Sequence, residues 1–166
     1  MELIDSIQGK HEYSISPGEV KSFSTPVTIS CFGLGSCVGV FLQDQKKGIA
    51  GGAHINLSDD FNDLGPNGKP DNVKQAIREL LEQLKERGSD LKALRAKVAG
   101  GASSPASPSS FAGNKNIESV INYLIEEKVF LAAMDVGGTQ NRIAKFDGVS
   151  GMLLIRHSDS NYYKVF

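Results

Sequence analysis

Two cysteines and three histidines are the side chains of this 166-residue chain best suited to nucleophilic chemistry. Cys37 ends the run Gly33-Leu34-Gly35-Ser36-Cys37, and His54 follows Gly51-Gly52, seventeen residues after Cys37. Glycines permit a sharp turn with positive φ, whose backbone N–H groups can converge on an oxyanion and favour a thiolate. An imidazole beside such a thiol takes its proton and later gives it to a leaving group. The pattern is therefore compatible with a Cys/His nucleophile, the alternative being a small buried hydrophobic residue in a hairpin.

Other reactive side chains give weaker signals. His11 and His157 have polar neighbours, so both are expected to face solvent. Asp59, Asp60 and Asp63 form an acidic loop, but the spacing and terminal Glu of a Ca²⁺-binding loop are missing. The chain has no CxxC, HExxH or GxGxxG motif. We therefore expect neither a metal site nor a cofactor.

Composition limits the partners and the compartment. With 18 Lys+Arg against 19 Asp+Glu, the formal charge of −1 provides no field for nucleic acid or an acidic membrane surface. The N-terminus carries Glu2 and Asp5 and no long apolar stretch, and no window approaches about 18 apolar residues. We expect a cytoplasmic protein without a membrane span, in which Cys31 and Cys37 are free thiols.

The residues around Cys37 and His54 are β-prone. We expect the first third of the chain to be a meander, with His54 at the end of a strand that neighbours the strand carrying the Cys37 turn. The strands are predicted over 11–15, 21–29, 38–42 and 48–57, with turns at 16–18, 25–26 and 44–47.

Two amphipathic helices are predicted further along. Apolar positions from Val73 to Leu84 follow one helical face, which Gly88 terminates. A second face runs from Ile117 to Ile125, with Asn116 as N-cap. Loops are predicted over 59–70 and 103–113, and strands over 94–102, 131–136, 142–146 and 152–156. The order predicts an α+β fold, a layered sandwich of mixed or antiparallel sheet with two main helices on one face.

A resemblance extends over nearly the whole chain. GLGSCVGV (33–40) followed by AHINL (53–57) resembles the CheD family of chemoreceptor glutamine deamidases, whose hallmark is a glycine-flanked Ser-Cys and a His 17 residues later. The resemblance implies a single deamidase domain, 1–166, with its core at about 11–157. Its further landmarks are the helix from Asn72, the strand end 97–102, residues 113–116 and 135–138, Arg142 and the closing hairpin 151–156.

The resemblance also implies catalytic roles. Cys37 would be the nucleophile, His54 the general base and acid, and the turn at Gly35 and Ser36 the oxyanion site. The mechanism would be attack on a glutamine carboxamide, loss of ammonia and hydrolysis of a thioester, which would also permit hydrolysis of a glutamate methyl ester.

One family position is different in this chain. The family has a threonine six residues before the nucleophile, which is thought to orient the histidine, and Cys31 stands there. A thiol is a weaker hydrogen-bond partner than a hydroxyl. Cys31, Ser30, Thr28 or a backbone group could therefore orient His54, although strand alternation places the Ser30 side chain opposite to that of Cys31.

The implied substrate is a glutamine on the cytoplasmic helical hairpin of a methyl-accepting chemoreceptor, and a CheC-type phosphatase is an implied partner. Leu57-Ser58 replaces the family's Leu-Pro, and the Ser/Pro-rich loop replaces its usual Met-Phe start. Both loops are expected to rim the site, so these differences concern substrate fit. The alternatives are a catalytically weak regulatory module that binds the phosphatase, or a cysteine hydrolase acting on other protein glutamines.

Overall fold

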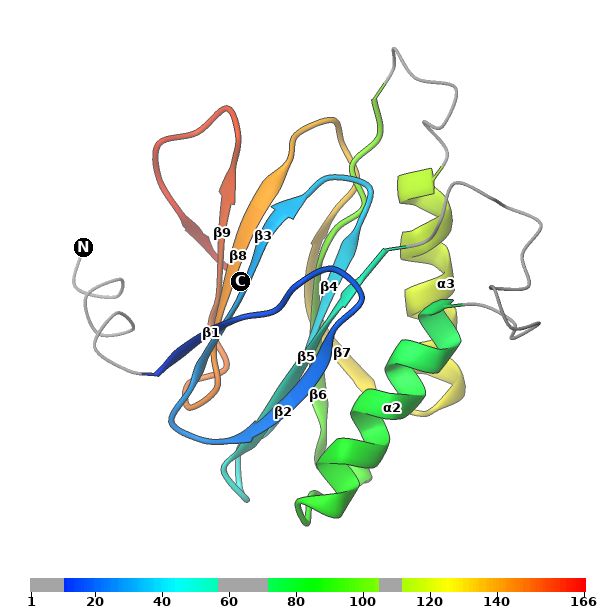
Figure 1. Ribbon diagram of the computed structural model, residues 1–166, viewed down its shortest axis with the longest axis vertical. Helices are drawn as coiled ribbons and strands as arrows, with labels where there is room; N and C mark the ends of the chain where they lie inside the picture. Colours follow the sequence, from blue (N-terminus) through cyan, green and yellow to red (C-terminus); the bar gives the residue numbers. More distant parts are fainter. Residues whose placement is uncertain (1–10, 57–71, 105–111) are drawn as a thin grey trace.

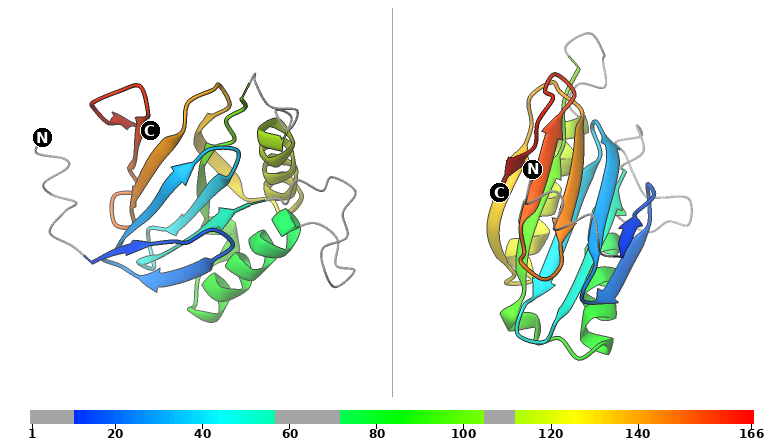
Figure 2. Two further views of the ribbon diagram at one scale, coloured as in Figure 1. Left: turned by 45° about the horizontal axis from the view of Figure 1, so that its top comes forward. Right: turned by 90° about the vertical axis from the view of Figure 1, so that its left-hand side faces the viewer.

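Two β-sheets face each other, and two helices cover the outer face of one of them (Figures 1 and 2). The computed structural model describes residues 11–56, 72–104 and 112–166. The predicted α+β sandwich with helices on one face is confirmed. The loop predicted over 59–70 lies outside the described residues, as do residues 105–111 of the loop predicted over 103–113.

Each sheet has five strands in the described part of the chain, and both are mixed because β1 pairs with β3, and β6 with β7, in parallel. The sheet without helices, here the open sheet, contains in spatial order β1 (Glu12–Ser14), β3 (Thr28–Leu34), β8 (Arg142–Asp147), β9 (Leu153–His157) and β10 (Lys164–Val165). The covered sheet contains β2 (Val20–Ser24), β5 (Ile49–Ile55), β4 (Val38–Asp44), β6 (Arg95–Gly100) and β7 (Phe130–Val136).

The predicted meander is wrong. The first four strands alternate between the two sheets, and among β1 to β5 only β4 and β5 form a hairpin. Every residue of β4 and β5 is buried, because one face of these strands packs under the helices and the other against the open sheet. Strands that are buried on both faces occupy the centre of a layered fold. The strand before them, β3, lies in the other sheet, where it pairs with β8 from a distant part of the chain.

The helices are α2 (Asn72–Glu86), a 3₁₀ turn η1 (Leu91–Ala93) and α3 (Ala112–Glu126). Gly88, with φ +98°, follows the end of α2 as predicted. The prediction that Asn116 caps the second helix is wrong, because α3 begins four residues earlier and Asn116 is buried inside it. Neither described helix is long and apolar enough to cross a membrane.

Two hydrophobic cores lie on the two sides of the covered sheet. Val38, Val40 and Leu42 of β4 pack toward the helices. Phe41 points the other way and stacks on Phe146 of β8, with ring centroids 5.4 Å apart. Alternation along β4 therefore places Gly39 on the face between the sheets.

Candidate active site

Cys37 lies in the turn that takes the chain from β3 of the open sheet to β4 of the covered sheet. Gly33, with φ +66°, provides the left-handed backbone conformation expected of this glycine-rich run. The turn is not a hairpin, because β3 and β4 belong to different sheets. Cys37 is half-buried and packs against the core between the sheets, so its thiol lies at the edge of that layer.

Three successive carbonyls of this turn accept hydrogen bonds from fixed donors. The N–H of Ala102 donates to the Gly35 carbonyl, and the Asn116 side-chain amide donates to the Ser36 carbonyl, at 2.8 and 2.7 Å. The N–H of Gly101 donates to the Cys37 carbonyl at 2.8 Å. The end of β6 and helix α3 therefore hold the turn along its length. Asn116, which the sequence suggested only as a cap, thus supports the candidate site.

The same bonds fix the direction of the turn's N–H groups. In a trans peptide the N–H points opposite to the preceding carbonyl, so the N–H groups of Ser36 and Cys37 point away from the donors that hold the turn. The N–H of Gly35 instead donates to the Gly33 carbonyl at 3.0 Å, so it is engaged within the turn in the free protein. Ser36 and Cys37 are the available donors.

Gly100 lies against the carbonyl of Cys37. Its φ is +113°, and a Cβ at this position would collide with that carbonyl oxygen. We expect Gly100→Ala to destabilise the fold by more than the roughly 1–3 kcal/mol that unfavourable backbone conformation alone costs, because the Cys37 turn must also move. Urea denaturation measures this loss.

The control for Gly100→Ala is Gly137→Ala. Gly137 has a similarly positive φ of +82°, but a Cβ there meets nothing within 4 Å. This variant should therefore show the cost of the backbone conformation without the collision. Equal losses in the two variants would contradict the packing of Gly100 on the Cys37 turn.

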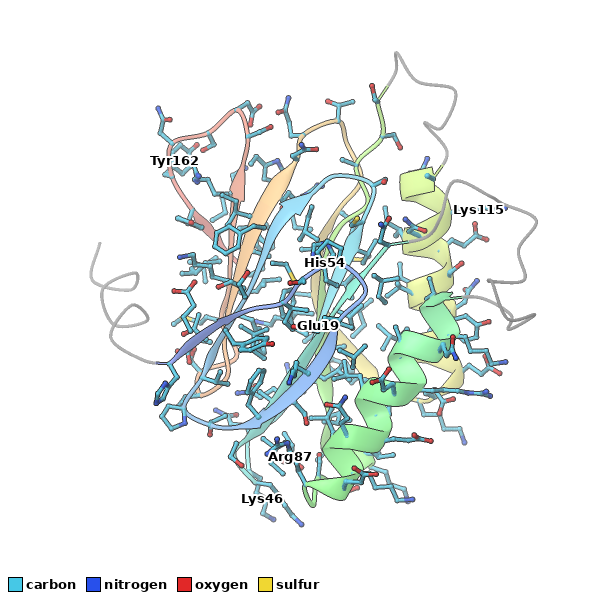
Figure 3. The ribbon with its side chains drawn as sticks, in the orientation of Figure 1. Glu19, Lys46, His54, Arg87, Lys115 and Tyr162 are labelled. Carbon is cyan, nitrogen blue, oxygen red and sulfur yellow. The ribbon has the colours of Figure 1, made fainter. Side chains whose placement is uncertain are left out.

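His54 lies on β5 directly opposite Gly39 of β4 and is only 2% exposed. Gly39 has no side chain, and the Phe41 ring and Leu34 pack closely over it on the face between the sheets, two residues after Cys37. Backbone bonds join His54 to Gly18 and Glu19, where the loop between β1 and β2 meets β5 (Figure 3). The predicted neighbour of the His54 strand, the strand that carries the Cys37 turn, is in the structure β4, which begins directly after Cys37.

The hydrogen bonding of His54 selects its tautomer. Its Nδ1 is 3.2 Å from the backbone carbonyl of Ile15. Since a carbonyl only accepts, Nδ1 carries the proton and Nε2 holds a free lone pair. Nε2 is buried and has no hydrogen-bond partner in the described part of the chain. A neutral imidazole with an unused Nε2 is the form that a general base requires.

Burial sets the protonation of both side chains. It lowers the pKa of His54, against a smaller opposing effect of the Ile15 carbonyl. It also raises the pKa of Cys37, and the opposing effect of its own N–H is weaker. The expectation that the turn favours a thiolate is therefore wrong for the free protein, because loss of hydration outweighs the N–H dipole. Both pKa directions favour the uncharged forms near neutral pH, a thiol at Cys37 and a neutral imidazole at His54.

Cys31 is fully buried in the core between the sheets. Burial, with a smaller effect of nearby Cys37, raises its pKa to about 12. Ser30 faces the other side of β3, where its hydroxyl donates to Glu12 at 2.6 Å, and Thr28 shares that side by alternation. Of the candidates considered from the sequence, it is a backbone group that contacts Nδ1 of His54, namely the carbonyl of Ile15.

The other two histidines differ from each other. His11 is exposed, as expected. His157 is partly buried, and its Nε2 is 2.7 Å from Asp135 Oδ2, so the prediction that it faces solvent is wrong. A carboxylate from β7 offers this imidazole a partner that its polar sequence neighbours did not reveal.

Within residues 11–56, 72–104 and 112–166, no group of three or more His, Cys, Asp or Glu side chains could hold a metal ion.

The chain matches a family model over residues 66–157, more than half of its length, and the model is that of CheD, described as chemotactic sensory transduction. The chain belongs to the CheD family. A Thermotoga maritima member named chemoreceptor glutamine deamidase CheD is 34% identical over 142 residues, which cover 86% of this chain and 89% of that protein. A Halalkalibacterium halodurans CheD with the same name is 37% identical over 149 residues, covering 86% of this chain and 91% of that protein. The resemblance to CheD is thus confirmed.

Proposed function

We propose that the protein hydrolyses glutamine side chains of chemoreceptors to glutamate, in the adaptation of bacterial chemotaxis, with Cys37 as nucleophile and His54 as base. The observation that carries this proposal is the buried, unpartnered Nε2 of His54 on the face between the sheets where Cys37 packs. The names of its CheD relatives supply the substrate class. The target is a glutamine on the cytoplasmic helical hairpin of a methyl-accepting chemoreceptor.

The chemistry follows from the resting pair of neutral groups. As the Cys37 sulfur attacks the carboxamide carbon, His54 Nε2 takes the thiol proton, so a costly buried thiolate is not formed in advance. The N–H groups of Ser36 and Cys37 stabilise the oxyanion, a contribution of order 10² to 10³ in rate for one such donor. The imidazolium then returns the proton to the departing nitrogen, which leaves as ammonia.

The second half-reaction uses the same groups in reverse order. His54 Nε2 takes a proton from water, whose oxygen attacks the thioester carbon between Cys37 and the substrate. The oxyanion again lies against the N–H groups of the turn. Its collapse releases glutamate, and the proton on His54 restores the Cys37 thiol.

The wider setting of the activity is also part of the proposal. The protein would act in the cytoplasm as one deamidase domain, since its substrate is the cytoplasmic part of a receptor. A CheC-type phosphatase is the proposed regulatory partner, and co-purification of the two proteins tests it. The alternative of a catalytically weak regulatory module rested on Cys31, which stands where the family has a threonine that orients the histidine. The Ile15 carbonyl contacts His54 Nδ1 directly, which weakens this alternative.

Trapping the thioester tests the proposed function. A receptor cytoplasmic fragment is incubated with the protein, with and without hydroxylamine, and peptides are sequenced by mass spectrometry. We expect glutamate at specific receptor glutamines without hydroxylamine, and γ-glutamyl hydroxamate at the same positions with it, because hydroxylamine attacks an acyl-enzyme in place of water. An unrelated helical protein with exposed glutamines serves as the control. An unmodified receptor, or equal modification of the control protein, would contradict the proposal.

A further inference from the structure

An arginine with almost no exposure lies beside the turn that carries Cys37. Arg142, at the start of β8, is 3% exposed. Its Nε is 3.3 Å from Asp135 Oδ2, and its Nη1 donates to the Gly100 carbonyl at 3.3 Å. A weaker 3.5 Å contact joins Nη1 to the Gln140 carbonyl. The guanidinium thus connects a carboxylate and a backbone carbonyl at the ends of two neighbouring strands.

His157 completes this cluster from the next strand. Its Nε2 is 2.7 Å from Asp135 Oδ2, the oxygen that also faces Arg142. Arg142 and His157 belong to β8 and β9 of the open sheet, whereas Asp135 and Gly100 belong to β7 and β6 of the covered sheet. The cluster therefore joins the two sheets by side-chain contacts.

Strand register connects Arg142 with the chain both before and after Cys37. Across β3 and β8 it pairs with Leu34, three residues before Cys37. Its acceptor Gly100 pairs across β4 and β6 with Val38, the residue after Cys37. The next residue, Gly101, holds the Cys37 carbonyl. The Arg142 side chain therefore fixes the distance between β3 and β4, the two strands that the Cys37 turn connects.

We propose that Arg142 is a positioning residue, which holds the sulfur and N–H of Cys37 in register with His54 by clamping Gly100 against the turn. This inference rests on the proposed function, because it needs Cys37 to be the nucleophile. A buried ion pair adds little stability relative to apolar side chains of the same volume, so stability alone explains the cluster poorly. The planar guanidinium holds two acceptors at fixed directions, which a lysine does not.

The test compares Arg142→Met, Arg142→Lys and a control on the same strand. Lys145→Met also removes a cation of β8 from an ion pair, with Glu12 at 3.3 Å, but three residues further along the strand, opposite Ser30 of β3. Steady-state deamidation of a receptor fragment gives kcat and KM, and thermal unfolding gives the folded fraction. We expect Arg142→Met to lower kcat by about 10- to 100-fold with KM little changed, since misplacement of a reacting group by about 1 Å costs on that order. Arg142→Lys should recover part of kcat, and Lys145→Met should keep it.

Several results would overturn the inference. These are an unchanged kcat in folded Arg142→Met, an equal loss in Lys145→Met, or a loss expressed only in KM. If Arg142→Met does not fold, Asp135→Asn is tested in its place, because the amide has the size of the carboxyl group but binds the guanidinium more weakly. This variant should lower kcat and leave KM unchanged. An unchanged kcat would contradict the proposal. If Cys37→Ala retains deamidation, the proposed function itself fails. An inactive Cys37→Ala with a fully active Arg142→Met rejects only the positioning role.

Discussion

Cys37→Ala should reduce receptor deamidation by more than about 10⁴-fold, because without the nucleophile only oxyanion stabilisation and substrate binding remain. The other thiol cannot replace it. Cys31 is fully buried and its pKa is raised to about 12, so it presents neither an accessible nor an ionisable sulfur near neutral pH. The measurement is the rate at which receptor glutamines become glutamate, followed by mass spectrometry at enzyme excess.

The matched variant for this prediction is Cys31→Thr, which places at position 31 the residue that the family pattern has there. It should keep most of the activity, because Nδ1 of His54 is already held by the Ile15 carbonyl. Circular dichroism and thermal unfolding confirm that both variants fold. A fully active Cys37→Ala, or a Cys31→Thr as inactive as Cys37→Ala, would show that the roles of the two cysteines are assigned incorrectly.

The local features of the site could be predicted because they depend on short stretches of sequence. Positive φ at Gly33 follows from the glycine-rich run. The pairing of the His54 strand with the strand after the Cys37 turn follows from two β-prone runs joined by a short polar turn, and these runs form the β4–β5 hairpin. Helix α2 was predictable from its apolar periodicity and from Gly88 after it.

The long-range features could not be predicted in this way. The crossing of the chain between sheets at Cys37 depends on β3 pairing with β8, more than a hundred residues later. The group that orients His54 is a main-chain carbonyl of Ile15, and a carbonyl present in every residue leaves no trace in the sequence. Asn116 and Arg142 bind backbone carbonyls of distant elements, so their side-chain types alone indicated a cap and a landmark.

The protonation of the pair also needed the structure. Sequence reasoning weighed the dipoles of the turn, which favour a thiolate, without the burial that opposes them. Because burial moves the pKa of Cys37 up and that of His54 down, the ion pair of a preactivated cysteine is disfavoured in the free protein. In the proposed mechanism, attack by the Cys37 sulfur and proton transfer to Nε2 then occur together, so the rate depends on the position of His54.

His54→Asn should lower kcat for deamidation by about 10²- to 10⁴-fold, the range that general acid–base catalysis contributes. The asparagine amide can still donate to the Ile15 carbonyl in place of Nδ1, while the base at Nε2 is lost. In the wild type, the acid limb of kcat/KM should fall below the ordinary histidine value of about 6.5, since burial lowers the pKa of His54.

The same shift predicts how stability depends on pH. The pKa of His54 is lower in the folded protein than in the unfolded chain, so this residue costs no stability at a pH above its unfolded pKa of about 6.5. As the pH falls below that value, the unfolded chain binds the proton first and the free energy of unfolding decreases. The decrease ends when the pH has passed the pKa of the folded protein. Urea denaturation between pH 7 and pH 5 should therefore show a smaller decrease for His54→Asn than for the wild type. The exposed His11 provides the control, because His11→Asn should change neither the acid limb nor this decrease. An acid limb that persists in His54→Asn with undiminished kcat would mean that another group takes the thiol proton, and the catalytic pair would have to be reassigned.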